Sequence, residues 1–299
     1  MKKRKWTALL LAALLCGAFL IGGCAGKSGD TIKIATKPMT EQFILSEMLA
    51  ALIEQDTDLE VEITKGIAGG TGNIHPAMVK GDFDLYPEYT GTAWTDVLKN
   101  TEEVTPDEMY QKLQEQYKDQ FNMEWVGLYG FNNTYTLAVK EEFAEQNKIE
   151  TFSDLASFTP DMKFGAEYDF YEREDGYDPL CETYGYQFGS TSDLDIGLKY
   201  QAIGADEVDV INAFTTDGSL GAYELKTLED DKNFFPSYYC GTIVREEALE
   251  AHPELRDVLM KMDGILTDEE MAQLNYRVEN DKEDEKTVAI DFLTQKGLL

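Results

Sequence analysis

The sequence has few of the residues that carry metal-binding, nucleophilic or nucleic-acid-binding chemistry. Its 299 residues include two histidines, four cysteines, and 26 lysines and arginines against 57 aspartates and glutamates, which gives a formal net charge of −31. So negative a field argues against a nucleic acid partner, whose phosphates attract positive charge. We interpret the acidic balance chiefly as a source of solubility.

The scarcity of cysteine restricts disulfides and metal sites. Cys16 and Cys24 lie near the N-terminus, which leaves only Cys181 and Cys240 in the rest of the chain. Neither belongs to a CxxC pattern or has a neighbouring histidine, so we expect no metal site. Their spacing permits a disulfide in an exported protein but does not require one.

Motifs typical of enzymes are also missing. His75 and His252 do not lie beside a GxSxG serine or a cysteine with a third group, so a hydrolase triad has no support. GIAGGTG, at residues 66–72, lacks the Lys-Ser/Thr pair of a P-loop and the spacing of a dinucleotide site. We expect a strand-to-helix turn there, and neither catalysis nor a cofactor.

The N-terminus has the layout of an export signal. Basic residues at positions 2–5 precede an apolar run at residues 9–21 that is too short to span a bilayer well. The run ends in IGGC, residues 21–24, which resembles a bacterial lipobox, where cleavage precedes a cysteine that becomes lipid-modified. We expect a signal peptide at 1–23 and a lipid anchor on Cys24 within a tether at 24–30. The alternative is a plain secretory signal with an incidental cysteine.

Strand and helix patterns alternate along the rest of the chain. TIKIAT at residues 31–36 and LEVEIT at 59–64 have the period-two pattern of strands. TEQFILSEMLAALIEQ, at 40–55, places Ile44, Met48 and Leu52 on one helical face. This alternation, with short links, predicts α/β lobes with largely parallel sheets.

Two helix starts are marked by capping-box sequences. Thr105 and Glu108 flank a proline, which predicts a helix that continues to about Gln120. Thr267 and Glu270 repeat the signature near the C-terminus.

One internal similarity indicates where a ligand would bind. DLYPEYT, residues 84–90, and DVINAFT, residues 209–215, share an aspartate, two apolar residues, an aromatic residue and a threonine. Ligands of open α/β sheets bind beyond the carboxyl ends of strands, so Tyr89 and Phe214 are expected at the rims of two facing lobes. The alternative is that so loose a match arises by chance.

Other aromatic residues are expected near the same cleft. They are Tyr135 in FNNTYTLAV, residues 131–139, and Tyr238 in FFPSYY, residues 234–239. Each ring alone is compatible with ordinary packing. Together they suggest a box for a quaternary ammonium, because each ring face attracts such a cation by about 0.5–2 kcal/mol.

The sequence resembles a known family over nearly all of the chain after the signal. The similar segments include TKPMTEQFILSEM, KGDFDLYPEYTGTAW, NNTYTLAV, FGAEYDFYEREDGYDPL, INAFTTDG, LEDDKNFFPSYY and the C-terminal region. They resemble the glycine betaine, carnitine and choline binding proteins of ABC-type osmoprotectant importers. The resemblance implies an α/β fold of the type II periplasmic-binding-protein kind. Its two lobes, residues 31–133 with 238–299 and residues 134–237, would be joined by two crossings around a ligand cleft.

The resemblance also implies site residues. The family's cage tyrosines match Tyr89, Tyr135 and Tyr238, Thr92 adds a polar contact, and Phe214 departs from a fourth tyrosine. The basic groups that hold a betaine carboxylate match Lys37 and Arg173, and Gln42 and Asn133 match positions near the ligand. Because Thr92 is not acidic, we expect no extra counter-charge for choline.

The expected function is therefore solute capture for import. An extracytoplasmic, lipid-anchored protein would bind a glycine betaine-like osmoprotectant in a cation-π cage and deliver it to an ABC permease with its ATPase. The alternatives are the same fold with choline, carnitine or another small solute, and a surface hydrolase.

Overall fold

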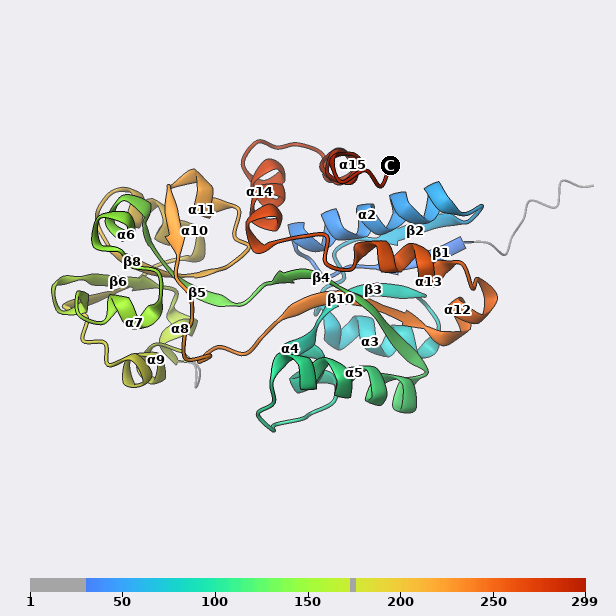
Figure 1. Ribbon diagram of the computed structural model, residues 1–299, viewed down its shortest axis with the longest axis horizontal. Helices are drawn as coiled ribbons and strands as arrows, with labels where there is room; N and C mark the ends of the chain where they lie inside the picture. Colours follow the sequence, from blue (N-terminus) through green and yellow to red (C-terminus); the bar gives the residue numbers. More distant parts are fainter. Residues whose placement is uncertain (1–30, 173–175) are drawn as a thin grey trace, which may run out of the picture. The chain divides into compact units, whose positions relative to one another are not determined.

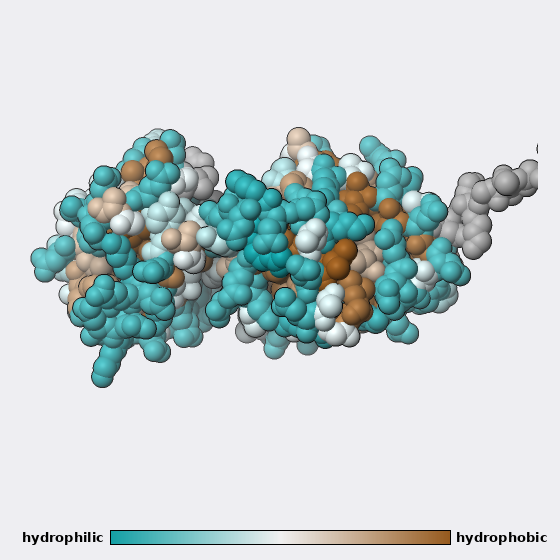
Figure 2. All heavy atoms as spheres, turned by 90° about the horizontal axis from the view of Figure 1, so that it is seen from above, coloured by the Kyte–Doolittle hydropathy of each residue, from teal (hydrophilic) through white to brown (hydrophobic). Residues whose placement is uncertain are grey.

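The computed structural model describes residues 31–172 and 176–299 (Figure 1). The expected signal peptide, the tether with Cys24, and Arg173 lie outside these residues. Ile32–Leu299 form one compact unit. Within the described ranges, no helix combines the length and the apolar character that crossing a membrane requires. The face seen in Figure 2 carries mostly hydrophilic side chains with smaller hydrophobic areas between them.

The first sheet has the strand order β2-β1-β3-β10-β4. Its strands are β1 (Thr31–Ala35), β2 (Glu60–Thr64), β3 (Leu85–Tyr89), β4 (Met123–Asn132) and β10 (Tyr239–Arg245). β1 and β3 are parallel, with Ile34 opposite Leu85. β10 is antiparallel to both of its neighbours.

The second sheet has the order β7-β6-β8-β5-β9. Its strands are β5 (Tyr135–Lys140), β6 (Lys163–Ala166), β7 (Ser190–Asp193), β8 (Val210–Phe214) and β9 (Leu225–Thr227). β6 is parallel to β7 and β8, whereas β5 is antiparallel to β8 and β9.

Both sheets are thus mixed, and the expectation of largely parallel sheets is wrong. Parallel neighbours need a crossover connection, which a βαβ unit provides. β5 and β10 are not reached in that way: β5 follows β4 after only Asn133 and Thr134, and β10 is entered when the chain returns from the second sheet. These two strands are therefore free to run against their neighbours.

Helices cover both faces of the first sheet (Figure 1). They are α2 (Thr40–Asp56), α3 (Thr71–Lys80), α4 (Thr90–Thr92), the π-helical turn η1 (Ala93–Val97), α5 (Pro106–Phe121), α12 (Glu246–Ala251), α13 (Leu255–Leu259), the 3₁₀ turn η3 (Met260–Met262), α14 (Asp268–Glu279) and α15 (Glu285–Gln295). Side chains of α2, α13, α14 and α15 form one apolar core, and those of α3, α5 and η1 form another. Ile44, Met48 and Leu52 are fully buried in the first of these cores, as the helical period predicts.

The second sheet is covered by shorter helices. They are α6 (Glu141–Asn147), α7 (Phe152–Leu155), the 3₁₀ turn η2 (Thr159–Asp161), α8 (Tyr168–Glu172), α9 (Tyr177–Tyr184), α10 (Ile196–Gly204) and α11 (Ser219–Ala222). Two further apolar cores flank this sheet, one rich in aromatic rings around Phe164 and one around Ile211.

The helix starts lie where the capping sequences predict them. Thr105 caps α5 and Thr267 caps α14, and in each case the glutamate three residues later, Glu108 or Glu270, completes a reciprocal capping box. Each box satisfies two amide groups that a helix start leaves without a partner. The second box fixes the start of the helix that carries Asn275 and Glu279.

The two similar segments occupy equivalent places in the two sheets. The Asp84 carboxylate accepts a 2.9 Å hydrogen bond from the Lys33 amide, and the Asp209 carboxylate accepts a 2.8 Å bond from the Lys163 amide. In return, each aspartate amide donates to the carbonyl of the same lysine at 2.9 Å. Each aspartate thus locks the start of a strand, β3 or β8, to its parallel neighbour. Tyr89 and Phe214 stand at the corresponding strand ends.

Candidate functional site

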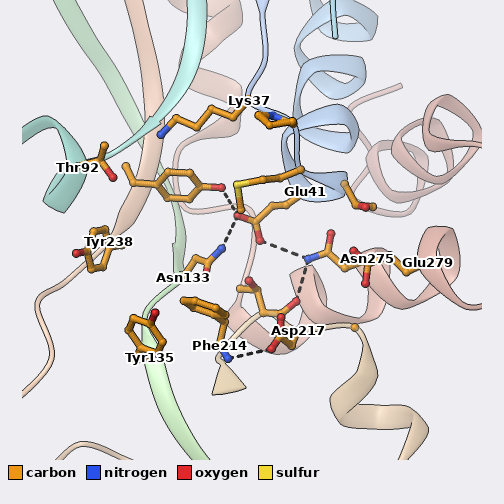
Figure 3. A pocket seen from close by; sticks show the side chains of 16 residues that line it. Lys37, Glu41, Thr92, Asn133, Tyr135, Phe214, Asp217, Tyr238, Asn275 and Glu279 are labelled. Carbon is orange, nitrogen blue, oxygen red and sulfur yellow. Dashed lines mark hydrogen bonds between the residues drawn. The ribbon is translucent and has the colours of Figure 1, made fainter. Parts of the chain in front are cut away.

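A cavity of about 720 Å³ lies at these strand ends. Its lining comes from both sheets, from both crossings and from α14, as Figure 3 shows. The lining residues are Lys37, Pro38, Met39, Thr40, Glu41, Tyr89, Thr92, Asn133, Tyr135, Phe214, Thr216, Asp217, Gly218, Tyr238, Asn275 and Glu279. This volume lies within the range of about 300–1,000 Å³ that is usual for small-molecule sites.

Four aromatic rings contribute to the wall. Tyr89 ends β3, Phe214 ends β8, Tyr135 begins β5, and Tyr238 directly precedes β10. Tyr135 and Phe214 are register partners across the β5–β8 ladder, with ring centroids 4.5 Å apart. Strand pairing therefore sets the spacing of the two rings from the second sheet.

The short α4, Thr90–Thr92, explains how Tyr238 reaches the cavity. A Cβ at Gly91 would lie 2.6 Å from the Tyr238 ring, so a larger residue at this position would displace the ring. The neighbouring Thr90 hydroxyl accepts a 3.1 Å hydrogen bond from the Tyr239 amide. This helical turn thus holds the start of β10 next to β3 while leaving room for the Tyr238 ring.

Lys37 lies at one side of the cavity, directly after the extended segment that continues β1. Its ammonium pairs with the Glu88 carboxylate and stands 4.6 Å from the centroid of the Tyr89 ring. Both members of the pair are buried, Glu88 completely. Lys37 is therefore held by protein groups on two sides.

Glu41 is the centre of a polar cluster behind the rings. Its carboxylate accepts hydrogen bonds from the Tyr89 hydroxyl at 2.5 Å, from Asn133 at 3.0 Å and from Asn275 at 3.4 Å. The Asn275 amide also donates to the Thr216 carbonyl at 2.9 Å. Burial raises the pKa of Glu41, and the hydrogen bonds act against this increase. The cluster ties α2 and α14 to the loop after β8.

The cavity wall is more acidic than the sequence indicated. Glu41, Asp217 and Glu279 all contribute to it, so the expectation of a pocket without an extra counter-charge is wrong. Burial raises the pKa of Glu279, and the charge of the nearby Asp217 raises it further. Thr92 does not determine the charge of the wall, because the acidic groups come from α2, α14 and the loop after β8.

The cavity brings together seven of the nine residues expected from the sequence: Lys37, Tyr89, Thr92, Asn133, Tyr135, Phe214 and Tyr238. Gln42 is fully buried beside the Tyr89 hydroxyl and does not contribute to the lining. Arg173 lies outside the described residues.

Four further residues line the cavity without having been expected from the sequence: Glu41, Asp217, Asn275 and Glu279. Asn275 and Glu279 had a detectable signal, because they lie four residues apart on the face of α14 that also carries the buried Met271. Glu41 precedes the expected Gln42 by one position, and acidic residues in the first turn of a helix are usually solvated. Asp217 follows the INAFTT segment and had no separate signal.

The cysteines and the candidate metal ligands lie elsewhere. Cys181 in α9 and Cys240 in β10 are free, so the disulfide that the sequence permitted is not formed. Cys181 lies in a helix that covers the second sheet, whereas Cys240 lies in a strand of the first sheet. Over residues 31–172 and 176–299, no group of three or more histidine, cysteine or acidic side chains is placed to hold a metal ion.

Two mixed sheets with flanking helices, two crossings and a cavity at the strand ends define a two-lobed periplasmic-binding-protein fold of type II. Comparison with known sequences agrees. The family model for the substrate binding domain of the ABC-type glycine betaine transport system matches residues 30–295, and the chain belongs to this family.

Named relatives have related functions. The chain is 43% identical over 299 residues to the ergothioneine transport permease/ergothioneine binding protein EgtU of Helicobacter pylori (strain G27), with 99% of this chain and 54% of that protein covered. The chain thus spans about half the length of that relative. It is 34% identical over 302 residues to the carnitine transport binding protein OpuCC of Listeria monocytogenes, with 99% and 98% covered.

A solved structure has the same fold. The crystal structure described as a glycine betaine/carnitine/choline ABC transporter superimposes with a TM-score of 0.86 at 34% identity, with 89% of this chain and 99% of that chain covered. The expected fold and class are confirmed: the chain is an extracytoplasmic substrate-binding protein of an ABC importer.

Proposed function

We propose that the protein captures a quaternary-ammonium betaine, of which glycine betaine is the simplest, in an aromatic cage. The observation that carries this proposal is the convergence of Tyr89, Tyr135, Phe214 and Tyr238 on one cavity. A methylated ammonium cannot donate N–H hydrogen bonds, so ring faces are its natural partners.

Cation-π attraction can supply a large part of the free energy of micromolar binding. Each ring face contributes about 0.5–2 kcal/mol to binding a cation, and a micromolar dissociation constant corresponds to about 8 kcal/mol. Four rings, together with removal of the methyl groups from water, therefore supply much of the required free energy. Phe214 lacks the hydroxyl of the tyrosines. Because the attraction of a cation comes from the ring face, we still expect Phe214 to contribute like the tyrosines.

We further propose that residues 31–133 with 238–299 and residues 134–237 act as lobes that close on the solute. The cavity wall draws on both sets. A solute shifts an open-closed equilibrium only as far as it binds the closed state better, which requires contacts from both lobes. The closed form would then dock on a permease whose ATPase drives import.

A second candidate is a betaine that carries a ring with N–H donors. Ergothioneine, the solute in the name of the H. pylori relative, is a trimethylammonium betaine of this kind. Glu41, Asp217 and Glu279 place acceptor groups on the same wall as the rings, which suits such donors. Choline and carnitine remain candidates with the same cationic group.

Titration calorimetry on the full chain in mild detergent tests these assignments. The solutes are glycine betaine, carnitine, choline and ergothioneine, with glycine and histidine as matched compounds without a quaternary nitrogen. We expect at least one methylated solute to bind at micromolar concentration or below, and the matched amino acids to bind far more weakly. A preference for glycine or histidine would refute the cage.

Substitutions test the cage directly. We expect Tyr89→Ala and Tyr238→Ala each to weaken binding of the preferred solute about tenfold or more, from lost cation-π attraction and packing. Tyr110→Ala is the control, because Tyr110 packs against Trp125 away from the cavity and reports general destabilisation. Equal losses in all three variants would argue against a cage.

We propose that the protein binds its solute without converting it. The family consists of substrate-binding domains, and the sequence offers no hydrolase motif. Proton NMR of the solute before and after prolonged incubation provides the test. Any new product that requires the protein would revive the alternative of a surface hydrolase.

We also propose a lipid anchor on Cys24, supported by the IGGC sequence at residues 21–24. Metabolic labelling with an alkyne fatty acid should mark the wild type and the Cys181→Ala control but not Cys24→Ala. Labelling of Cys24→Ala at the wild-type level would refute the anchor.

A further inference from the structure

The Tyr89 ring already has a cation of the protein next to it. The Lys37 ammonium lies 4.6 Å from the ring centroid and pairs with the buried Glu88 carboxylate. The Lys37 side chain is 9% exposed and contributes to the cavity wall, whereas the Glu88 side chain is 0% exposed and does not. Glu88 therefore does not line the cavity, and it influences a solute there through its charge and through the position of Lys37.

The position of Glu88 is fixed by more than the ion pair. Its carboxylate also accepts hydrogen bonds from the Thr71 hydroxyl at 2.6 Å and from the Tyr89 amide at 2.7 Å. Thr71 begins α3, at the end of the glycine-rich turn. Gly70, with φ of 51°, lies against the Lys37 stem, where an added Cβ would be 3.7 Å from Lys37 Cγ. Strand, turn and helix therefore converge to hold the ammonium in one place.

The charges around the cavity are arranged asymmetrically. Among the lining residues that the structure describes, Lys37 is the one basic side chain, and Glu41, Asp217 and Glu279 are acidic. Figure 3 shows Lys37 and Asp217 on opposite sides of the cavity. A zwitterion gains most when its carboxylate faces Lys37 and its methylated nitrogen lies toward Tyr135 and Phe214. A plain cation gains nothing from Lys37 and is repelled by it.

We propose that Glu88 is a positioning residue that sets the preference of the cavity between zwitterions and plain cations. It holds Lys37 on the Tyr89 ring and offsets the charge that Lys37 presents, so that the pocket accepts a carboxylate without excluding a solute that lacks one. This inference rests on the proposed binding of a quaternary ammonium.

Substitutions of Glu88 and of Lys37 are expected to have opposite effects. Glu88→Gln leaves the lysine charge without its counter-charge, which strengthens attraction of a carboxylate and repulsion of a plain cation. Lys37→Met keeps the stem but removes the charge, and leaves a buried carboxylate that favours a plain cation. If the ion pair were merely structural, breaking it would weaken the binding of zwitterions and of plain cations equally.

The test is the ratio of the dissociation constant of choline to that of glycine betaine, measured by calorimetry on the full chain in detergent. Both solutes carry a trimethylammonium group, and only glycine betaine carries a carboxylate. We expect Glu88→Gln to raise this ratio, and Lys37→Met to lower it, by about tenfold. If ergothioneine is the tighter ligand, the same ratio is read with ergothioneine and its decarboxylated analogue, which keeps the trimethylammonium group.

Lys199→Met is a matched control. Lys199 is 1% exposed, lies 3.0 Å from Glu167, and has its ammonium 5.7 Å from the Tyr200 ring, but it does not contribute to the cavity. It should leave the ratio within about twofold of the wild type, as expected for a buried pair that acts on stability alone. Thermal unfolding shows which variants are folded. Lys37→Met carries the test if Glu88→Gln does not fold, because Glu88 keeps its bonds from Thr71 and Tyr89.

A ratio in Lys37→Met that matches the Lys199→Met control would overturn the inference while leaving the proposed function intact. If the wild-type protein bound none of the methylated solutes, both the inference and the proposed function would be overturned.

Discussion

The Tyr89 hydroxyl donates a 2.5 Å hydrogen bond to Glu41, which joins the end of β3 to the first turn of α2. Tyr89 is 5% exposed, and Glu41 behind its ring is 3% exposed. A tyrosine of the cavity wall is therefore oriented from behind by a buried acid.

Tyr89→Phe separates the ring face from its hydroxyl. The ring still faces a cation, so we expect solute affinity to change by less than about threefold, within the modest difference between the two faces. Glu41 loses a buried donor, so the free energy of unfolding should fall by about 1–3 kcal/mol. Urea unfolding and calorimetry measure the two quantities. A large loss of affinity with unchanged stability would contradict this division.

Glu41→Gln should change the pH dependence of stability. The pKa of Glu41 in the folded protein is raised above its ordinary 4.5, so the folded state keeps this proton to higher pH than the unfolded chain does. The wild type should therefore lose stability relative to Glu41→Gln as pH rises from 4.5 through the folded-state pKa. Urea unfolding at a series of pH values measures the difference. A difference that does not vary with pH would show that Glu41 does not titrate in this way.

Gly91→Ala should move the Tyr238 ring without removing it. An added Cβ would lie 2.6 Å from that ring, and the backbone near Ser237 is also close, so the ring must shift. We expect affinity to fall about threefold to tenfold, between that of the wild type and that of Tyr238→Ala. Gly72→Ala is the control, because nothing lies within 4 Å of a Cβ there. Wild-type affinity in Gly91→Ala would show that the close approach does not matter for binding.

Phe214 distinguishes ring attraction from simple apolar contact. Phe214→Leu keeps much of the apolar volume but removes the π face, so we expect a weaker complex by about 0.5–2 kcal/mol. Phe214→Tyr restores the residue typical of the family and should bind at least as well as the wild type. Equal affinities of the leucine variant and the wild type would indicate that this ring is only packing.

Thr267→Ala tests the helix that carries part of the cavity. Loss of the cap of α14 should cost about 1 kcal/mol of unfolding free energy. Thr105→Ala removes the equivalent cap of α5 and should cost a similar amount. Because Asn275 and Glu279 belong to α14, only Thr267→Ala is expected to weaken solute binding as well. If both variants changed solute binding equally, the start of α14 would have no special role in the site.

Much of the fold could be predicted because its signals are local. The period of α2 and the caps Thr105 and Thr267 each depend on a few neighbouring residues. Strand direction was missed because a strand has the same pattern in either direction. β5 and β10 run antiparallel through the path of the whole chain, which no short segment specifies.

The site was predictable to the extent that strand ends mark it. Tyr89 and Phe214 were found because a strand and its last ring are adjacent in sequence. The pairing of Lys37 with Glu88 spans 51 residues and leaves no local pattern. Glu41 was missed because only the tertiary structure distinguishes a buried acid from the many solvated ones.

The register of β4 and β10 places Asn132 opposite Tyr239, at the points where the chain leaves and re-enters the first sheet. The second sheet is thus inserted in the chain between β4 and β10, which pair as neighbours in the first sheet. Excision of the inserted segment would bring the two cut ends together across one antiparallel rung, so a turn of a few residues could rejoin them and leave every strand of the first sheet in place.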